Sequence, residues 1–368
     1  KPATLLFADA AVEKLEREKT LPAKFERILK RLNLNNLVAD KNVVIKMHLG
    51  RDIGFTTIPP VFVRILVKAV KNASAQSVKI IEETVFETDT EIGVARGYTE
   101  EVLDCSVVSC FGRDGSYHYK EHIGYKTLDD VRLSGEAVDS DVFIDLSHVK
   151  GHGQCGFGGA LKNIAMGLVT RGSRSKIHSL EGGLIHDREK CTYCLKCFDA
   201  CPNEAIRKNN EKKEISFFFH DCTYCQHCVM ICPENAITVE DSKFEDFSHG
   251  MAQVTAKFLK KFTPENLLFI NFLTQITVYC DCWGFSSPSL VPDIGILTGN
   301  DIGAIDTASL NMIKTENLLP NGLPKNRKLI DRDGHLFERI HGKNPYLMIK
   351  YLEDYYDCTT EYEIVEVK

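Results

Sequence analysis

The stretch CTYCLKCFDACP, residues 191–202, recurs as CTYCQHCVMICP at residues 222–233. Each copy has three cysteines spaced C-x-x-C-x-x-C, a fourth cysteine after three further residues, and a proline directly behind it. Three thiolates at this spacing wrap a loop around an iron–sulfur cube, while the fourth is held at a distance and ligates the second cube. The repeat therefore predicts two [4Fe-4S] clusters with crossed ligands. The ligands would be Cys191, Cys194, Cys197 and Cys232 for the first cluster, and Cys222, Cys225, Cys228 and Cys201 for the second.

Zinc sites or disulfides are the alternative interpretation of these cysteines. Zinc ribbons use two separate CxxC pairs and need neither a third cysteine nor a trailing proline in each copy. With fourteen cysteines in a chain of 368 residues, eight of them at metal spacing, a reducing cytoplasmic location is expected. A net charge of −6 argues against a nucleic-acid partner, and no apolar run approaches the ~18 residues of a membrane span.

Short apolar runs alternate with amphipathic segments on both sides of the cysteine motifs. NVVIKMHL (42–49) is typical of a buried strand, and VFVRILVKAV (61–70), opened by two prolines, is typical of a helix. Such alternation indicates an α/β fold with a mainly parallel sheet. The predicted strands cover residues 42–49, 77–85, 106–111, 140–150, 267–280 and 293–299, and the predicted helices cover 61–70, 99–105, 251–262, 302–313 and 345–356.

The flanks of the cysteine motifs are predicted to form one domain. Neither flank looks sufficient to bury a core of its own, so residues 1–186 and 241–368 would be two parts of one α/β domain. Residues 187–240 would then be an insertion. Within that insertion, the polar stretch KNNEKKE (208–214) is expected to form a hairpin or loop.

The insertion resembles the bacterial two-cluster ferredoxin over about residues 187–240. The sequence departs from such ferredoxins at Leu195 and Gln226, where they usually carry glycine. We expect this difference to alter backbone hydrogen bonding to the cluster sulfurs, and so the reduction potential, more than ligation itself.

Several stretches outside the cysteine motifs are similar to the domain-of-unknown-function family 362, in its form with an inserted ferredoxin. The most specific are DLSHVKGHGQCGFGGALKNIAMG (145–167), RGSRSKIHS (171–179) and CDCWGFSSPSLVPDIGILTGNDIGAIDTASL (280–310). The resemblance implies an iron–sulfur protein of anaerobic metabolism. It implies no particular substrate, because the family is named for its unknown function.

A glycine-rich stretch and a group of cations suggest a site for an anion. The stretch GQCGFGGALKN (153–163) enters a predicted helix, whose free amides could bind a carboxylate or phosphate. A cationic loop is expected at 171–178, and the preceding strand ends where α/β sheets usually place ligands. The alternative is that the glycines serve close packing and the cations face solvent. The candidate ligand-binding residues are Gly158, Gly159, Lys162, Asn163, Arg171, Arg174, Lys176 and His178, with Lys150 and His152 as catalytic candidates.

Two cysteines at the end of the predicted strand 267–280 are further catalytic candidates. Cys280 and Cys282 would project from one face of that strand, with Asp281 on the other. Paired thiols there could bind a soft metal or act as a redox pair, and we expect these roles rather than a stable disulfide between them. Burial as small core side chains is the alternative. The same rim would carry Lys46, His48, Glu82 and Glu83.

Two functions fit the sequence. The first is a redox enzyme that passes electrons from the clusters to a ligand held by the α/β domain. The second is a non-catalytic electron carrier whose α/β domain docks a partner enzyme. An enclosed polar cavity near one cluster would favour the first, and a flat apolar patch over a cluster the second. Both imply a redox partner protein, and no GxGxxG motif supports a nicotinamide or flavin site.

Overall fold

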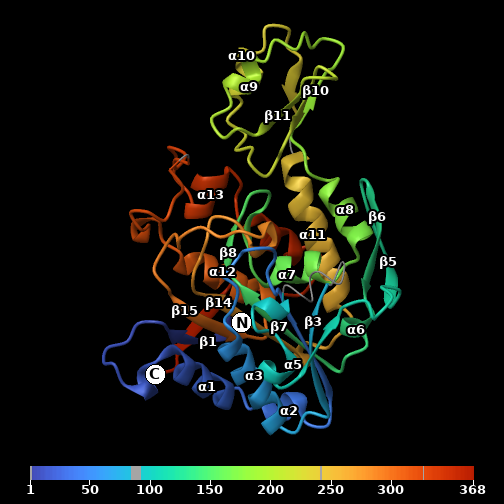
Figure 1. Ribbon diagram of the computed structural model, residues 1–368. Helices are drawn as coiled ribbons and strands as arrows, with labels where there is room; N and C mark the ends of the chain where they lie inside the picture. Colours follow the sequence, from blue (N-terminus) through green and yellow to red (C-terminus); the bar gives the residue numbers. More distant parts are fainter. Residues whose placement is uncertain (1, 84–92, 241–242, 326) are drawn as a thin grey trace.

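The structure, a computed structural model, describes residues 2–83, 93–240, 243–325 and 327–368. An eight-stranded sheet crosses the molecule and takes strands from both sides of the cysteine motifs (Figure 1). Its strands are β1 (Ala3–Asp9), β2 (Asn42–Met47), β3 (Ser77–Glu82), β4 (Ser106–Ser109), β7 (Val142–His148), β14 (Leu267–Leu273), β15 (Gly295–Gly299) and β16 (Tyr362–Glu366).

The order of the sheet is β16-β1-β15-β14-β7-β2-β3-β4. Among these strands only β15 runs antiparallel to its neighbours, so the mainly parallel sheet predicted from the sequence is confirmed. The central strands β7 and β14 are buried at every residue. Strands covered on both faces read as continuous apolar runs, which is why they were recognisable in the sequence.

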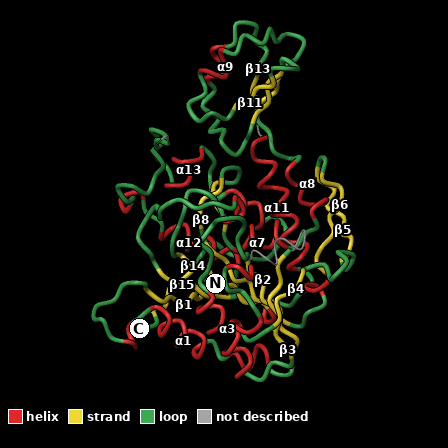
Figure 2. The backbone as a smooth tube through the Cα atoms, viewed as in Figure 1, coloured by secondary structure: helices red, strands yellow, loops and turns green. Residues whose placement is uncertain are grey.

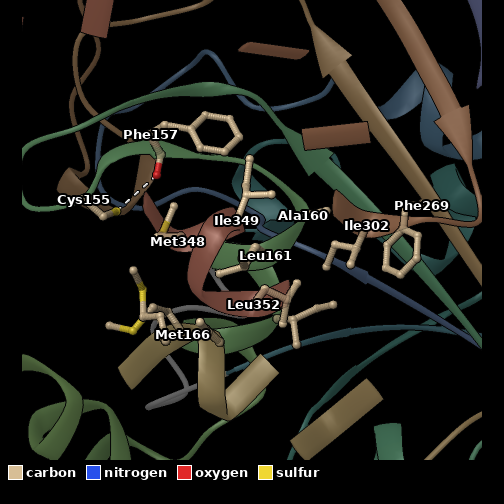
Figure 3. Packing of buried hydrophobic residues seen from close by; sticks show 14 of the residues in the cluster. Cys155, Phe157, Ala160, Leu161, Met166, Phe269, Ile302, Met348, Ile349 and Leu352 are labelled. Carbon is tan, nitrogen blue, oxygen red and sulfur yellow. Dashed lines mark hydrogen bonds between the residues drawn. The ribbon is translucent and has the colours of Figure 1, made fainter. Parts of the chain in front are cut away.

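Helices cover both faces of the sheet and create two cores (Figure 2). Successive side chains of a strand point to opposite faces, so Phe143 enters one core while Val142 and Ile144 enter the other. Figure 3 shows part of the first core, where Leu161 packs near Met348. The helices are α1 (Leu21–Arg31), α2 (Leu34–Val38), α3 (Pro60–Asn72), α5 (Glu100–Leu103), α6 (Gly135–Val138), α7 (Ala160–Gly167), α8 (Arg171–His178), α11 (Lys243–Leu259), α12 (Ile302–Met312), α13 (Leu336–His341) and α14 (Leu347–Glu353).

Most of the predicted elements are present with shifted ends. The predicted strand 77–85 is β3, and its last two predicted residues lie outside the described part of the chain. Two hairpins were not predicted, β5 (His118–Tyr125) with β6 (Leu128–Ser134) and β8 (Lys150–His152) with β9 (Gly156–Gly158). No helix in the described residues is long and apolar enough to cross a membrane.

The predicted strand 267–280 is wrong beyond Leu273, where β14 ends. Ile276 and Val278 remain fully buried, although they lie on the irregular chain that follows β14. Their burial produces the apolar pattern that resembled a longer strand. The chain then enters the 3-10 helix η3 (Asp281–Trp283), with Cys280 as its N-cap.

The predicted cationic loop 171–178 is also wrong, because these residues form α8. Thr170 caps this helix by accepting a hydrogen bond from the backbone N–H of Ser173. The many charged side chains favoured a loop, but a helix with one buried face tolerates them on its outer surface.

The cysteine-rich segment projects from one end of the molecule (Figure 1). It begins and ends with paired strands, β10 (Leu184–His186) and β13 (Ile237–Val239). Each four-cysteine motif carries one short helix, α9 (Lys196–Asp199) or α10 (His227–Ile231). Between the motifs, β11 (Ile206–Asn209) and β12 (Glu214–Phe217) form the hairpin predicted for the polar stretch 208–214.

The two positions that depart from glycine adopt the conformation for which glycine is best suited. Leu195 and Gln226 both have a φ of 61°, in the left-handed region, and each immediately precedes a helix of the segment. Residues with a Cβ are disfavoured there by about 1 kcal/mol or more. Both positions therefore keep the left-handed backbone conformation, although their side chains make that conformation less favourable.

Replacing Gln226 with glycine should raise the stability of the protein, because this exposed side chain makes no packing contribution to offset its backbone strain. We expect the free energy of unfolding to rise by about 1 kcal/mol, measured by anaerobic denaturant titration. His227→Gly, one residue later at an ordinary helical position, should instead lower it. Equal losses in both variants would show that Gln226 is not strained.

Candidate functional site

A cavity of about 430 Å³ opens at the carboxyl ends of β2, β3 and β7, beside the start of α7. This is the edge of the sheet at which α/β proteins bind ligands. It brings together residues from distant parts of the chain. The predicted site residues that line it are Lys46, His48, Glu82, Lys150, His152, Gly158, Gly159, Lys162, Asn163, Arg174, His178, Cys280 and Cys282.

Three predicted residues do not line the cavity. Lys176 lies on the surface, where its Nζ pairs with Asp130 at 2.8 Å. Arg171 also lies outside the lining, and the carboxylate of Glu83 is buried in an ion pair with Arg174. Because 171–178 is a helix, only the side chains of one face, including Arg174 and His178, reach the cavity.

Asp281 lies at the centre of a buried charged network, which sequence reasoning missed. Its carboxylate accepts hydrogen bonds from Nζ of Lys150 at 2.9 Å, Nδ1 of His148 at 2.8 Å and Oγ1 of Thr56 at 3.0 Å. Burial alone would raise the pKa of Asp281, but Lys150 and His148 outweigh it and hold that pKa well below its usual range. Asp281 is buried and lies in η3, so the expected extended strand with Asp281 on the face opposite the cysteines is wrong.

His148 carries positive charge in this network. Its Nδ1 faces Asp281, and its Nε2 lies 2.8 Å from the backbone carbonyl of Thr274. Both acceptors are oxygens without a proton to donate, so both ring nitrogens must donate. Asp281 is thus held between two cations, His148 and Lys150, both of which line the cavity.

A second buried ion pair, between Lys46 and Glu82, lines the cavity. Nζ of Lys46 lies 2.7 Å from Oε2 of Glu82, and Nδ1 of His48 lies 3.4 Å from Oε1. Burial opposes ionisation of Glu82, but Lys46 and His48 outweigh it and lower the pKa of the carboxyl to about 2. Asn163 links this pair to Asp145, whose pKa burial raises to about 8.

Lys162 is a cation of the cavity that has no counter-charge. Within the described residues it makes no ion pair, and burial lowers the pKa of its ammonium group to about 8. Lys46 and Lys150, by contrast, each have a carboxylate partner. Lys162 is half-buried, and an ammonium group without a counter-charge in such a place favours an anion in the cavity.

The glycine-rich stretch packs closely, and the first two amides of α7 are bound within the protein. The backbone N–H groups of Ala160 and Leu161 donate to the carboxylate of Asp306, each at 2.9 Å. A Cβ on Gly159 would lie 2.5 Å from Oδ1 of Asp306 and the same distance from the ring of Phe157. Asp306 already binds the first two amides of α7, so the expectation that they bind an anionic ligand is wrong. For Gly159 the alternative interpretation, close packing, holds.

His152 presents a hydrogen-bond donor to the cavity. Its Nδ1 accepts hydrogen bonds from the backbone N–H groups of Gln154 at 3.2 Å and Cys155 at 3.3 Å. Burial, reinforced by the charge of Lys162, holds the pKa of His152 well below its usual range, so the ring is neutral. A neutral imidazole whose Nδ1 accepts carries its proton on Nε2.

Cys280 and Cys282 are joined by a disulfide, which corrects the expectation that they would not be. The pair does not lie on an extended strand, since the chain turns into η3, and the Cα atoms are 5.4 Å apart, a distance that a disulfide spans. A ring nitrogen of His152 and both sulfurs lie within 4.8 Å of one another.

The base of the cysteine-rich segment forms one wall of the same cavity. His220, which lines the cavity, precedes the motif cysteine Cys222 by two residues. Trp283 packs against His220, with ring centroids 5.5 Å apart, directly after Cys282. The ammonium group of the buried Lys343 donates to the backbone carbonyls of Phe219 and Cys222 and fixes the segment here.

The motif cysteines surround two small hollows within the segment. One is lined by Cys201, Cys222, Cys225 and Cys228, and the other by Cys191, Cys194, Cys197 and Cys232. Each hollow therefore takes three cysteines from one motif and the fourth from the other. The fourth cysteine of each motif accepts an equivalent hydrogen bond. The sulfur of Cys201 accepts one from the backbone N–H of Ala205 at 3.2 Å, and the sulfur of Cys232 accepts one from that of Ala236 at 3.3 Å.

Fold and site together define an α/β protein with a buried cationic cavity against a segment of two four-cysteine motifs. The chain belongs to the family described as Domain of unknown function (DUF362), whose family model matches residues 43–311. The family predicted from the sequence is therefore confirmed. No curated protein matches the chain.

Two solved structures are similar to the chain at low identity. One is the lactate racemase apoprotein from Thermoanaerobacterium thermosaccharolyticum, with 16% identity and a TM-score of 0.36 over 74% of this chain and 51% of that one. The other is a structural-genomics protein from Thermotoga maritima, with 12% identity and a TM-score of 0.35 over 70% and 52%. The chain thus spans about half the length of each.

Sequence reasoning did not assign several cavity residues. Arg51, Ser147, His148 and His220 all line the cavity. His148 carried a weak signal, since it stands two residues before Lys150 at the end of a predicted strand. His220 carried none, because its place in the cavity depends on how the segment docks.

Proposed function

We propose that the protein is an iron–sulfur redox protein whose cysteine-rich segment is a ferredoxin-like insertion holding two [4Fe-4S] clusters. The two hollows support this proposal, because each is lined by the four thiols that the crossed assignment requires. The N–H groups of Ala205 and Ala236 would hydrogen-bond to ligand sulfurs, as is usual around such clusters. Thiolate ligands of this kind suit a reducing, cytoplasmic setting.

The bound clusters would supply single electrons to the cavity. The observation that carries this part of the proposal is the position of His220, which lines the cavity two residues before the ligand Cys222. Trp283 contacts His220 and adjoins Cys282. The predicted cluster ligand Cys222 is therefore connected to the Cys280–Cys282 disulfide through residues 220–222 and the ring contact between His220 and Trp283.

We assign the Cys280–Cys282 disulfide as the two-electron acceptor within the cavity. Its reduction breaks the S–S bond, takes two electrons and two protons, and gives two thiols. His152 lies beside both sulfurs and would donate a hydrogen bond from its Nε2–H to a thiolate formed there, while the two protons would come from the ammonium groups of Lys150 and Lys162, which line the same cavity. When the disulfide forms again, the same two electrons and two protons pass to a reducible ligand.

The ligand would be a small anion, such as a carboxylate or phosphate ester. The cavity has room for one, and Lys162 supplies an uncompensated positive charge. The guanidinium group of Arg174 also lines the cavity. A cavity lined by these charged residues favours this function over that of a carrier that only docks a partner.

A redox partner would still have to deliver the electrons. Met230 and Ile231 are 72% and 46% exposed and lie directly before Cys232, a predicted ligand of the cluster on the Cys191 side. Apolar surface beside a cluster ligand suits transient docking of an electron donor. We therefore place electron entry there.

Counting electrons tests the assignment of the disulfide. After anaerobic oxidation, a reductive titration of the wild-type protein should consume about four electrons, one for each cluster and two for the disulfide. The Cys280→Ser, Cys282→Ser double variant should consume about two. Cys105→Ser, a buried cysteine outside the cavity, should match the wild type. A count of about two in both wild type and double variant would refute the redox role of the pair.

Lys162→Gln should weaken binding of anions in the cavity, because it removes the ammonium group that has no counter-charge. Inorganic phosphate or succinate is a suitable probe, and we expect affinity to fall about ten-fold or more, measured by calorimetry. Lys176→Gln removes an equal charge outside the cavity and should leave affinity unchanged. Equal effects of the two substitutions would mean that only net charge matters.

A further inference from the structure

Two histidines and a glutamate meet where the cysteine-rich segment joins the α/β domain. Oε1 of Glu181 lies 2.6 Å from Nδ1 of His178 and 3.6 Å from Nδ1 of His220. The three residues can offer ligand atoms that all lie within 4.8 Å of one another. Both histidines also line the cavity, so the group is at its edge.

The sequence places these ligands on two separate parts of the structure. His178 ends α8 and Glu181 follows three residues later, so both come from one continuous stretch. His220 comes from the cysteine-rich segment, whose backbone is held by the ammonium group of Lys343 at Phe219 and Cys222. Docking of the segment therefore completes the group.

His220 has an unsatisfied nitrogen in this group. Its Nδ1 is buried and has no hydrogen-bond partner, since Glu181 is too distant for one. A buried polar atom without a partner costs about 1–3 kcal/mol, and a metal ion bound at this nitrogen would remove that cost. The lone pair of an imidazole nitrogen beside a carboxylate is suited to a metal ion.

The rings around the group hold it in place. His220 stacks on Phe218 with centroids 5.5 Å apart, and His178 stacks on Phe247 at 5.3 Å. Side chains fixed by such packing lose little entropy when they bind a metal.

The other cluster of potential ligands, His152 with Cys280 and Cys282, is less suited to a metal. The sulfurs are bonded to each other, and the ring nitrogen of His152 that is not engaged by backbone carries a proton. Of these two groups, His178, Glu181 and His220 are therefore better suited to bind a metal ion.

We propose that His178, Glu181 and His220 bind one divalent transition-metal ion at the edge of the cavity. Two imidazole nitrogens and one carboxylate oxygen suit Zn²⁺, Fe²⁺, Co²⁺ or Ni²⁺, and three protein ligands leave coordination positions open. Those positions would be available to an anion in the cavity. The site stands independently of electron transfer, although it lies beside the path assigned above.

Metal binding can be measured on the intact protein with its iron–sulfur clusters loaded. Anaerobic equilibrium dialysis against Co²⁺, with elemental analysis, should give about one Co²⁺ per chain beyond the cluster iron. Glu181→Gln and His178→Asn should each weaken Co²⁺ binding at least about ten-fold, while cluster iron and sulfide stay unchanged. His122→Ala, an exposed histidine on β5, should bind Co²⁺ like the wild type.

Two outcomes would overturn the proposal. One is Co²⁺ binding of wild-type strength in both Glu181→Gln and His178→Asn. The other is loss of Co²⁺ binding in the Cys280→Ser, Cys282→Ser double variant, which would place the metal at the cysteine pair. Cluster iron and sulfide report separately on the proposed function, so failure of the metal site is distinguishable from failure of the clusters.

Discussion

Replacing Cys201 with alanine should remove about half of the iron and sulfide, leaving about four of eight irons per chain. The lost cluster should be the one whose other ligands are Cys222, Cys225 and Cys228, because these four thiols surround one hollow. Alanine is preferable to serine, since it leaves no oxygen to replace the thiolate. Iron and acid-labile sulfide are measured after anaerobic purification.

Double substitutions identify which cluster is lost. Adding Cys222→Ala to Cys201→Ala should cost no further iron, because both residues serve the same cluster. Adding Cys191→Ala instead should remove nearly all of it, because the other hollow then also lacks a thiol. The reverse pattern would show that each motif binds a cluster with its own four cysteines.

Asp281→Asn should destabilise the protein strongly. The substitution leaves His148 and Lys150 as buried cations without their counter-charge, and breaking a buried pair in this way costs about 3–5 kcal/mol. We expect a loss of this size in the free energy of unfolding, measured by denaturant titration of the loaded protein. The loss would be smaller if water or an anion from the cavity compensates Lys150.

A surface carboxylate gives the matched control for this prediction. Asp130 also pairs with two cations, Lys120 at 3.1 Å and Lys176 at 2.8 Å, but the side chains of these lysines are 67% and 46% exposed. Asp130→Asn should cost less than about 1 kcal/mol, because solvent screens exposed ion pairs. Equal losses of free energy of unfolding in the two variants would show that burial does not strengthen the ion pairs of Asp281.

The sequence allowed several elements to be recognised because their patterns are local. Helix α12 was predicted at 302–313 and is found at Ile302–Met312, with Asp301 as a capping residue. Strand β2 was predicted from an apolar run that a buried parallel strand requires. The elements at the far edge of the sheet, β1 and β16, were not predicted, although they pair with each other along their length.

Predictions failed where a local pattern had two possible tertiary causes. The apolar residues after Leu273 looked like more strand, yet Ile276 and Val278 are buried in irregular chain. The cations of 171–178 looked like a loop, yet they decorate a helix. In each case the residue type indicates whether a side chain is buried or exposed, and several backbone conformations can give a side chain the same burial.

The two cysteine motifs could be recognised from the sequence alone, because the cysteines of each motif lie within a few residues of one another, and the crossed sets of four thiols predicted from the repeat match the sets that line the two hollows. The sequence also determined the α/β class and most of the residues that line the cavity, because parallel strands bring their carboxyl ends to one edge. Only the tertiary structure decided that Asp281 joins His148 and Lys150, that Asp306 occupies the start of α7, and that His220 reaches His178 and Glu181. These contacts join residues far apart in the chain, and no local spacing encodes which distant side chain packs against which.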